Sequence, residues 1–594
     1  MKVLLVCVTL VHIAFAQLCA QEDSLNQILD DIQEEGAALN SWLEVISDQI
    51  LLLEKSTENK YPQISFIHRL QYTLEKNVGL VKNIYLGSPI ESYSKLRLSL
   101  YKNVSAGVLI QKDVGELSLT DHYSGYLSWV HPKNSIKFIL GNFFIRSGDG
   151  LLLSGPYSLP KISLIKTFSS KQLNQIRPFL SSNEYDGFWG GALELGNSEG
   201  WKLIFFYSQI LRDAILSNNH TEASGFERTG YHRTLSERNR ANRILERSIG
   251  GTFSFPFFFI DHLGFSYVKT IYAPGIRASE SITDKRRVYF KYNGNRNENY
   301  SIFYAQNFNA LCLSGEIVPL KSKRIAHITT LNIHPSDWQI VLKSWYIPSQ
   351  FQSPFGRIPA DSNPFPQSVQ GFIFGITGNL WSSIHMTSFW TYKKDLWRTF
   401  FQPLPGQKKE FYIQSAVKIG QKKYLHIRYH LTKSYSYPNE MPGRLEKVKH
   451  SLRFQLKQSL DANIQFLTRL EKVFLRYASF YPSKSGINFY QDLYWQIKQS
   501  IGLRVRFSSF STDDYDSRLY EYENDLPHVF SNFALYGKGR KWYVMLTAGP
   551  ISHIKIWLKY RRITFDDVQS IGSGLMKIDG NMRQDIHLQV EYRY

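Results

Sequence analysis

Polar and apolar residues alternate with a period of two over most of this chain. The clearest case is the final segment, DIHLQVEYRY (585–594), in which every second residue is apolar or aromatic. Such alternation gives a β-strand one apolar and one polar face. Similar segments recur from about residue 92 onward, for example at 425–431, 452–457 and 554–560. The pattern predicts an all-β protein.

The connections between these segments are alternately short and long. Gly420–Lys423 and Tyr536–Gly539 are typical of tight turns. The polar stretches 211–249, 348–368 and 509–526 are expected to be long exposed loops. Alternating short turns and long loops are typical of transmembrane β-barrels, whose long loops lie outside the cell. We therefore predict a large antiparallel transmembrane β-barrel of ~22–26 strands over residues 86–594.

The N-terminal region has different patterns. In residues 1–20, Lys2, an apolar run and Ala14-Phe15-Ala16 predict a signal peptide for Sec-type export. Residues 21–85 have helical spacing of apolar positions, ending in a third candidate helix with Ile64, Ile67, Leu70 and Leu74 on one face. We expect a small α-helical periplasmic segment, which would dock a periplasmic protein or act as a plug.

The C-terminus ends on a strand pattern with Tyr592 and Tyr594 on its apolar face. This ending resembles the C-terminal signal that the barrel-assembly machinery reads in outer-membrane proteins. In a closed barrel, the last strand would pair with the first. The expected location is the outer membrane of a Gram-negative bacterium, in contact with outer-membrane lipid and lipopolysaccharide.

Composition supports this class of protein. Aromatic residues make up 15% of the chain, with 36 Tyr and 39 Phe, as the aromatic girdles of a membrane barrel would require. An aromatic-rich soluble β protein is the alternative. The net charge is +20, so a basic lumen or basic loops would attract anions, although a solvated basic surface is an equal alternative. The 3 Cys suggest neither a disulfide framework nor a metal site, and no cofactor is expected.

The first stretch that could carry function is LGNFFIRSGDGLLLSGPYSLPK (140–161). Gly148, Asp149 and Gly150 interrupt the strand pattern, and Arg146 could pair with Asp149. This backbone could fold into the lumen and plug it, or it could simply bend the barrel wall. It does not match a phosphate-binding loop.

The second stretch is rich in arginine. It contains the candidate anion-binding residues Arg228, His232, Arg233, Arg238, Arg240, Arg243 and Arg247. Arginine favours bidentate contacts to phosphate and carboxylate groups. A segment that binds an anionic glycan or lipid headgroup is one interpretation, and internal Arg–Glu pairing that holds the loop in place is the other.

These stretches also carry a resemblance. GVLIQKDVGE (from Gly107), DHYSGYLSW, LGNFFIRSGDGLLLSGP and the TGYHRTLSE segment (from Thr229) resemble a family of Bacteroidota-type outer-membrane β-barrel proteins. That family usually begins with helix-hairpin-helix repeats similar to those of competence DNA-uptake proteins. The resemblance implies a barrel over about 100–594. This chain has Gly148-Asp149-Gly150 where the family has Gly-Gln-Gly, and it contains no recognisable helix-hairpin-helix repeat, so nucleic-acid binding is not predicted by its own residues.

No catalytic or metal motif is found. His232 and Ser236 lie close in sequence, but no orienting acid is specified, and His426 and His430 share the polar face of one strand. We therefore expect a protein that is not an enzyme. The main hypothesis is a channel or transport-type barrel that passes or holds anionic solutes or glycans. The alternatives are a plugged scaffold that docks periplasmic partners and, by family resemblance alone, a DNA-uptake-related protein.

Overall fold

The computed structural model describes residues 62–594 apart from 132–134, 157–160, 167–173, 198–199, 218, 220, 278–288, 359–367, 399–401, 437–443 and 479–480. The predicted signal peptide and the first two candidate helices, within 1–61, lie outside the described residues. Among the residues that are described, no helix is long and apolar enough to cross a membrane.

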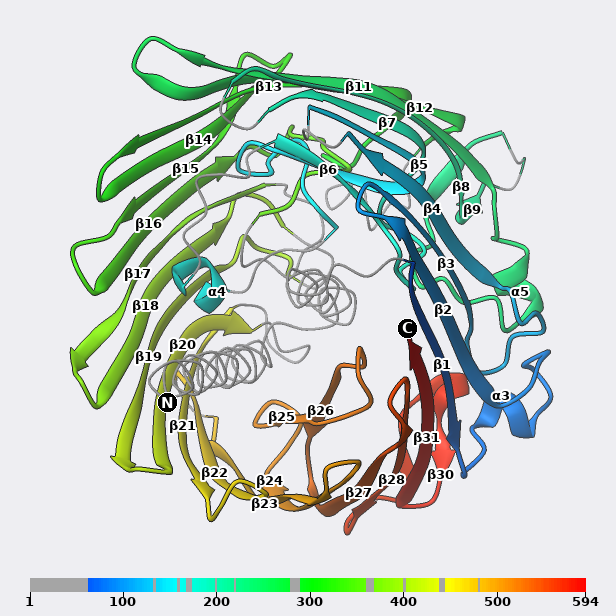
Figure 1. The fold of residues 1–594 in the computed structure, drawn as a ribbon, viewed down its shortest axis with the longest axis vertical. Coiled ribbons are helices and arrows are strands. Elements are labelled where there is room, and N and C mark those ends of the chain that lie inside the picture. Colours follow the sequence, from blue (N-terminus) through cyan, green and yellow to red (C-terminus); the bar gives the residue numbers. More distant parts are fainter. Residues whose placement is uncertain are drawn as a thin grey trace, which may run out of the picture.

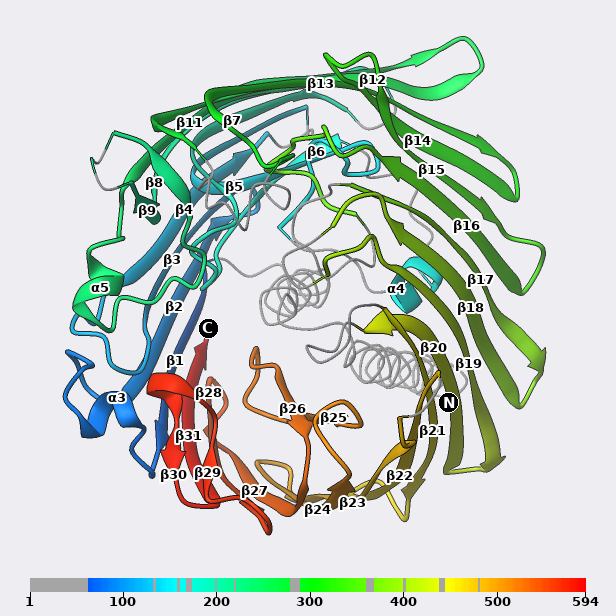
Figure 2. The same cartoon turned by 180° about the vertical axis from the view of Figure 1, so that it is seen from behind.

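The described chain forms a closed antiparallel barrel of 24 strands (Figures 1 and 2). Its strands, in the order in which they pair around the cylinder, are β1 (Gln63–Thr73), β2 (Ile90–Tyr101), β3 (Val104–Lys112), β4 (His122–Val130), β5 (Ile136–Ser147), β7 (Phe188–Gly196), β8 (Lys202–Arg212), β11 (Ile244–Phe257), β12 (Ile260–Ile276), β13 (Gly294–Phe308), β14 (Leu311–Pro319), β15 (Ile325–Ile333), β16 (Trp338–Ile347), β17 (Val369–Trp381), β18 (Ile384–Asp395), β19 (Gln407–Gly420), β20 (Lys423–Ser436), β21 (Leu445–Ser459), β22 (Ile464–Tyr477), β23 (Lys484–Lys498), β24 (Ile501–Thr512), β27 (Lys538–Ile551), β28 (Ile554–Phe565) and β31 (Met582–Arg593).

The smaller described elements lie in the connections between these strands. They are α3 (Val78–Val81), α4 (Lys161–Lys166), β6 (Asn174–Pro178), β9 (Ala214–Leu216), β10 (Ala223–Phe226), α5 (Leu235–Arg238), β25 (Leu519–Glu523), β26 (Ser531–Leu535), β29 (Ser570–Ile571), η1 (Gly574–Met576) and β30 (Ile578–Asp579). Figure 1 shows β6, α4, β25 and β26 inside the ring of strands.

The last strand closes the barrel as predicted. β31 pairs with β1 from Asp585–Thr73 to Arg593–Ser65, and its other edge pairs with β28. Its polar face is buried in the interior, with Gln589 fully buried and Glu591 nearly so, whereas Ile586 faces outward. Pairing on both edges leaves no open strand edge, which is the condition for a sheet to stand in lipid.

β21 has the same outward apolar face and inward polar face as β31. On β21, Leu452 and Phe454 are 38% and 41% exposed on the outer face, while Arg453 and Gln455 between them are 5% and 8% exposed. In a soluble protein the apolar face would be the buried one. The inverted pattern is that of a barrel whose outer face meets lipid.

The third predicted helix is wrong. Residues 63–73 form β1 instead, because the same sequence also alternates, and its backbone pairs with both β2 and β31. Pairing on two edges overrides a weak helical spacing. β1 crosses from the end with the chain terminus and the short turns to the end with the long loops. Residues 74–85, including α3, therefore lie at the long-loop end.

The lumen contains a segment that the sequence predicts as an exposed loop. Residues 509–526 begin within β24 and continue into the hairpin β25–β26, which folds into the barrel. Glu521 and Glu523 on this hairpin are fully buried. Three cations from the wall, Lys541, Lys559 and Arg561, form ion pairs with Glu523.

Candidate functional site

The barrel wall is interrupted where β5 leaves β4. β3 pairs with β4 as far as His122, but β5 pairs with β4 only from Val130–Lys137 to Tyr126–Gly141. Beyond Gly141, β5 turns inward, and its residues Phe143–Ser147 pair with β6. Among the described strands, none takes its place beside the first four residues of β4.

Two local features stabilise this departure. Gly141 has a φ of +93°, and a Cβ there would lie 2.2 Å from the carbonyl oxygen of Gly125, so only glycine fits. The Asn142 Oδ1 atom then accepts hydrogen bonds from the Gly125 N–H (2.8 Å) and the Ser124 hydroxyl (3.0 Å). The side chain of Asn142 thus bonds to the part of β4 that β5 has left.

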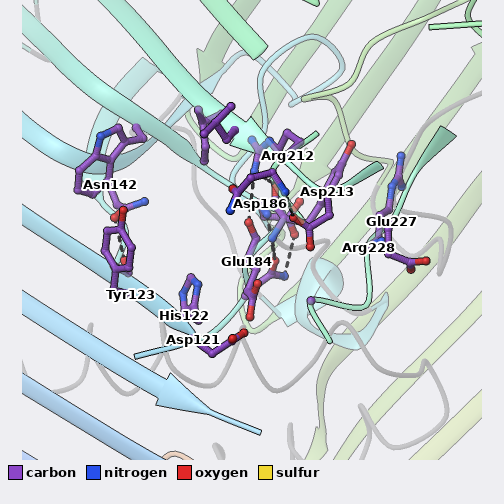
Figure 3. Close-up of a pocket in the computed structure, with 18 of the residues that line it drawn as sticks. Asp121, His122, Tyr123, Asn142, Glu184, Asp186, Arg212, Asp213, Glu227 and Arg228 are labelled. Atoms are coloured by element: carbon purple, nitrogen blue, oxygen red, sulfur yellow. Dashed lines mark hydrogen bonds between the residues drawn. The ribbon is translucent and has the colours of Figure 1, made fainter. Parts of the chain in front are cut away.

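A cavity of about 400 Å³ lies in this gap, between β4 and β8 (Figure 3). Three of its lining residues, Tyr123, Trp189 and Leu211, lie on the outer face and are 65%, 38% and 52% exposed. Others, including Ser124 and Arg212, are buried on the inner side. Because its lining comes from both faces of the sheet, the cavity crosses the barrel wall.

His232 anchors the loop that borders this cavity. Its Nδ1 lies 2.6 Å from Asp121 Oδ2, and its Nε2 lies 2.8 Å from Asp213 Oδ2. Hydrogen bonds to the two aspartates raise the pKa of His232 to about 11. The ring is therefore an imidazolium that donates from both nitrogens and joins the ends of β4 and β8.

Two overlapping groups of side chains have metal-ligand spacing. Glu116, Asp121 and His232 form one, and Glu184, Asp213 and His232 form the other, with ligand atoms within 4.8 Å of one another. An imidazolium has no lone pair to offer a metal ion. The double ion pair of His232 thus favours a structural role for this histidine.

Glu184 lines the cavity within 4.8 Å of His232, whose two ring nitrogens already bond to aspartates. Among the described residues, its carboxyl group forms no hydrogen bond or ion pair, whereas Asp186 pairs with Arg357 at 2.6 Å and Glu227 with Arg240 at 3.1 Å. Burial raises the pKa of Glu184 to about 9. Its side chain is drawn in Figure 3 between Asp121 and Arg212.

The structure separates the predicted anion-binding residues. Arg228 and His232 line the cavity, and the Arg228 guanidinium lies 4.5 Å from the centre of the Tyr185 ring. Four of the remaining five make local contacts: Arg233 with Glu237, Arg240 with Glu227, Arg243 with the Asn239 carbonyl, and Arg247 with Gln209. Arg238 is exposed on α5. Two of these contacts are the Arg–Glu pairs of the alternative interpretation. Whether any of the seven binds an anion stays a prediction.

The predicted lumen residues lie against the wall of β14 and β15. Asp149 accepts hydrogen bonds from Ser314 (3.1 Å) and Thr330 (2.9 Å) rather than forming the expected pair with Arg146, which lies on β5 next to β6. Gly148 (φ +57°) and Gly150 (φ +86°) shape the turn. Glu316 receives the next two backbone N–H groups, of Leu151 and Leu152, at 2.8 and 3.1 Å.

A second cavity, of about 300 Å³, lies between β19–β21 and the start of the hairpin connection. Its basic lining residues are Lys161, Lys408, Arg428, His430, Lys447, Lys449 and Arg518. Its acidic lining residues are Glu410 and Asp516. The sequence predicted only one feature of this cavity, His430 on the polar face of a strand. The neighbouring lysines were not predicted as candidate residues.

No family model matches the chain, and no curated protein matches it. Solved outer-membrane proteins resemble the barrel. The siderophore receptor PirA from Acinetobacter baumannii is 7% identical with a TM-score of 0.40, and the alignment covers 91% of this chain and 81% of that one. The FrpB iron transporter from Neisseria meningitidis is 9% identical with a TM-score of 0.41, covering 92% and 83%. An anion-selective porin from Comamonas acidovorans is 7% identical with a TM-score of 0.29, covering 50% and 89%. The resemblance to the helix-hairpin-helix family stays a prediction, and the proposals below depend on the residues of this chain alone.

Proposed function

We propose that this protein is an outer-membrane transport barrel that binds anionic solutes in the basic cavity of β19–β21. The observation that carries the proposal is the composition of that cavity, in which seven basic side chains face two acidic ones. The outward apolar face of strands such as β21 supports placement in a membrane.

The ion pairs of the cavity leave a basic surplus, although Arg428 is paired at 2.7 Å with Glu471, which does not line the cavity. Glu410 lies close to Lys161, to Lys408 (2.5 Å) and, at 3.9 Å, to His430. The single carboxylate of Glu410 is therefore the acidic partner of three basic groups. In a cavity walled by protein, such a surplus attracts anions more strongly than it would on an open surface.

The hairpin connection forms one side of this cavity. Lys447 pairs with Asp516 at 3.0 Å, and Lys449 donates to the Arg518 carbonyl at 3.1 Å. An anion bound by these lysines would compete with the contacts that hold the connection. This coupling favours a plugged barrel that binds a solute first over a permanently open pore.

The test uses the full-length protein in nanodiscs, with tripolyphosphate as an anionic probe and maltotriose as a neutral one. We expect saturable binding of tripolyphosphate by isothermal titration calorimetry and none of maltotriose. Binding should weaken by at least tenfold in the Lys447→Gln/Lys449→Gln variant and should be unchanged in Lys498→Gln, which alters an exposed lysine at the end of β23. Equal binding by all three proteins would refute the proposed site.

Under this proposal the protein binds and transports solutes and does not catalyse a reaction. His232 contacts Asp121 and Asp213, and these contacts hold a loop instead of activating Ser236. A plugged scaffold is the second candidate, and the fully buried hairpin acids favour it. Bilayer conductance separates the two, because a scaffold would stay closed in the presence of tripolyphosphate.

A further inference from the structure

We propose that the cavity in the barrel wall is a lateral binding site for a single-chain amphiphile with an amine headgroup, which reaches it from the lipid. The alkyl chain would lie against the outward aromatic residues Tyr123 and Trp189, and the amine would bind the carboxyl group of Glu184. The inference requires the barrel to lie in a membrane, but it does not depend on anion binding at β19–β21.

The barrel sheet is interrupted at this cavity. A closed membrane barrel satisfies its backbone groups by pairing every strand on both edges. Here the first residues of β4 lack β5 as a neighbour, and side-chain contacts replace the ladder: Asn142 bonds to Ser124 and Gly125, and the Phe179 and Ser181 carbonyls bond to the side chains of Ser124 and His122. The opposite edge belongs to β8, whose last residues pair with β11 while its pairing with β7 ends at Ser208–Gly190. An opening between two strand edges follows from this register.

The lining of the opening changes from aromatic on the outside to polar on the inside. Tyr123 and Trp189 form an edge-to-face pair on the outer surface, with ring centroids 6.2 Å apart. Tyrosine and tryptophan at the ends of membrane strands favour the level of lipid headgroups. Toward the lumen the lining becomes polar, with Asn142, Glu184 and Arg212 (Figure 3). An apolar chain outside and a polar head inside match this order.

Acidic side chains outnumber basic ones in the lining of the cavity. Its acids are Asp121, Glu184, Asp186, Asp213 and Glu227, and its basic residues are Arg212, Arg228 and His232. His232 engages Asp121 and Asp213, Arg357 engages Asp186, and Arg240 engages Glu227. Arg212 is held by Glu246 at 3.0 Å. Glu184 remains: its partly buried carboxyl group lies within 4.8 Å of His232, which two aspartates already engage, and among the described residues it forms no hydrogen bond that a ligand with a donor and a positive charge would displace.

An amine meets this requirement better than an anionic head does. A protonated amine placed against Glu184 would form a partly buried ion pair, while a carboxylate or phosphate head would add a further negative charge beside five acids. The headgroup could come from membrane lipid or from solution, and both sources share the same chemistry. A long chain is required only if the site is filled from the membrane.

The experiment uses the full-length protein in zwitterionic nanodiscs and a dodecylamine that carries a photoreactive diazirine on its chain. We expect cross-links concentrated in peptides 121–126 and 185–190. Unlabelled dodecylamine should compete for them, whereas dodecanoate and butylamine should not. Competition by butylamine as strong as by dodecylamine would show access from solution and would overturn the lateral route.

Two variants and a control complete the design. Glu184→Gln should weaken competition by dodecylamine at least tenfold, and Trp189→Leu should reduce the cross-link yield without changing the preference for amine over carboxylate. Glu222→Gln alters a half-exposed acid of the same loop region that does not line the cavity, and it should behave as the wild type. Folding of each variant is checked by heat-modifiable gel mobility. Cross-links spread evenly over the outward-facing strands, or equal competition by dodecanoate, would refute the site.

Discussion

Replacing Glu523 with glutamine should release the hairpin β25–β26 from the barrel wall. Glu523 is fully buried and pairs with Lys541 (2.9 Å), Arg561 (3.2 Å) and Lys559. Glutamine keeps the shape of the side chain but removes its charge. The contacts of Lys559 and Arg561 with Oε1 then change from charge-assisted to ordinary, and the contact of Lys541 with Oε2 is lost because an amide nitrogen cannot accept, which costs about 1 kcal/mol per contact.

The sum, about 3 kcal/mol, agrees with the cost of about 3–5 kcal/mol for removing one partner of a buried ion pair. A change of this size shifts the ratio of docked to released hairpin by about 100-fold. The hairpin should become cleavable by a protease added to the purified barrel, and single-channel recordings should show more frequent opening.

A matched control and a double variant sharpen the test. Asp567→Asn removes an acid that is 60% exposed and lies 3.7 Å from Lys538, so it should change neither cleavage nor conductance. Glu523→Gln/Lys541→Gln also removes the partner of Glu521, which lies 2.8 Å from Lys541, so it should release the hairpin further than the single variant. If Glu523→Gln is cleaved and conducts as the wild type does, the buried ion pairs do not hold the hairpin.

Three further outcomes follow from the geometry. Gly141→Ala should destabilise the barrel by about 1–3 kcal/mol in urea unfolding, because its φ of +93° and the carbonyl oxygen 2.2 Å away leave no room for a Cβ. Gly549→Ala, where the nearest atom to an added Cβ is 3.8 Å away, should not destabilise it. Glu316→Gln should weaken the hold on Leu151 and Leu152 and speed proteolysis of the inward segment. The raised pKa of His232, about 11, means that its contribution to stability is complete below about pH 6.5 and lost as pH rises toward 11. A thermal melt of His232→Asn that follows pH as the wild type does would contradict this.

The barrel itself could be predicted from the sequence because the signal is local. Strand alternation, short turns such as Gly420–Lys423 and the closing strand at Asp585–Tyr594 depend on neighbouring residues only, and each was confirmed. The error at 64–74 has the same origin. That segment satisfies both a helical and an alternating spacing, and only pairing with β2 and β31, at the other end of the chain, selects the strand.

The site could not be predicted because its parts are distant in sequence. His232 was selected as a candidate, but the two acids that hold it lie 111 and 19 residues away, and neither belongs to a motif. Glu521 and Glu523 read as part of a polar exposed loop for a similar reason. Their burial depends on Lys541 and Lys559 on the facing wall, and no local pattern distinguishes a solvated acid from one buried beside a cation.

The placement of charge inside the barrel changes the meaning of the net charge of +20. Cations of the wall at β27 and β28 are already neutralised by the acids of the hairpin, so they are not available to a solute. A basic surplus lies in the cavity at β19–β21, where Lys447 and Lys449 also contact the hairpin connection. Release of the hairpin and binding of an anion can therefore be tested separately. Glu523→Gln should open the lumen and leave tripolyphosphate bound, while Lys447→Gln/Lys449→Gln should weaken that binding at least tenfold and leave Glu523 holding the hairpin.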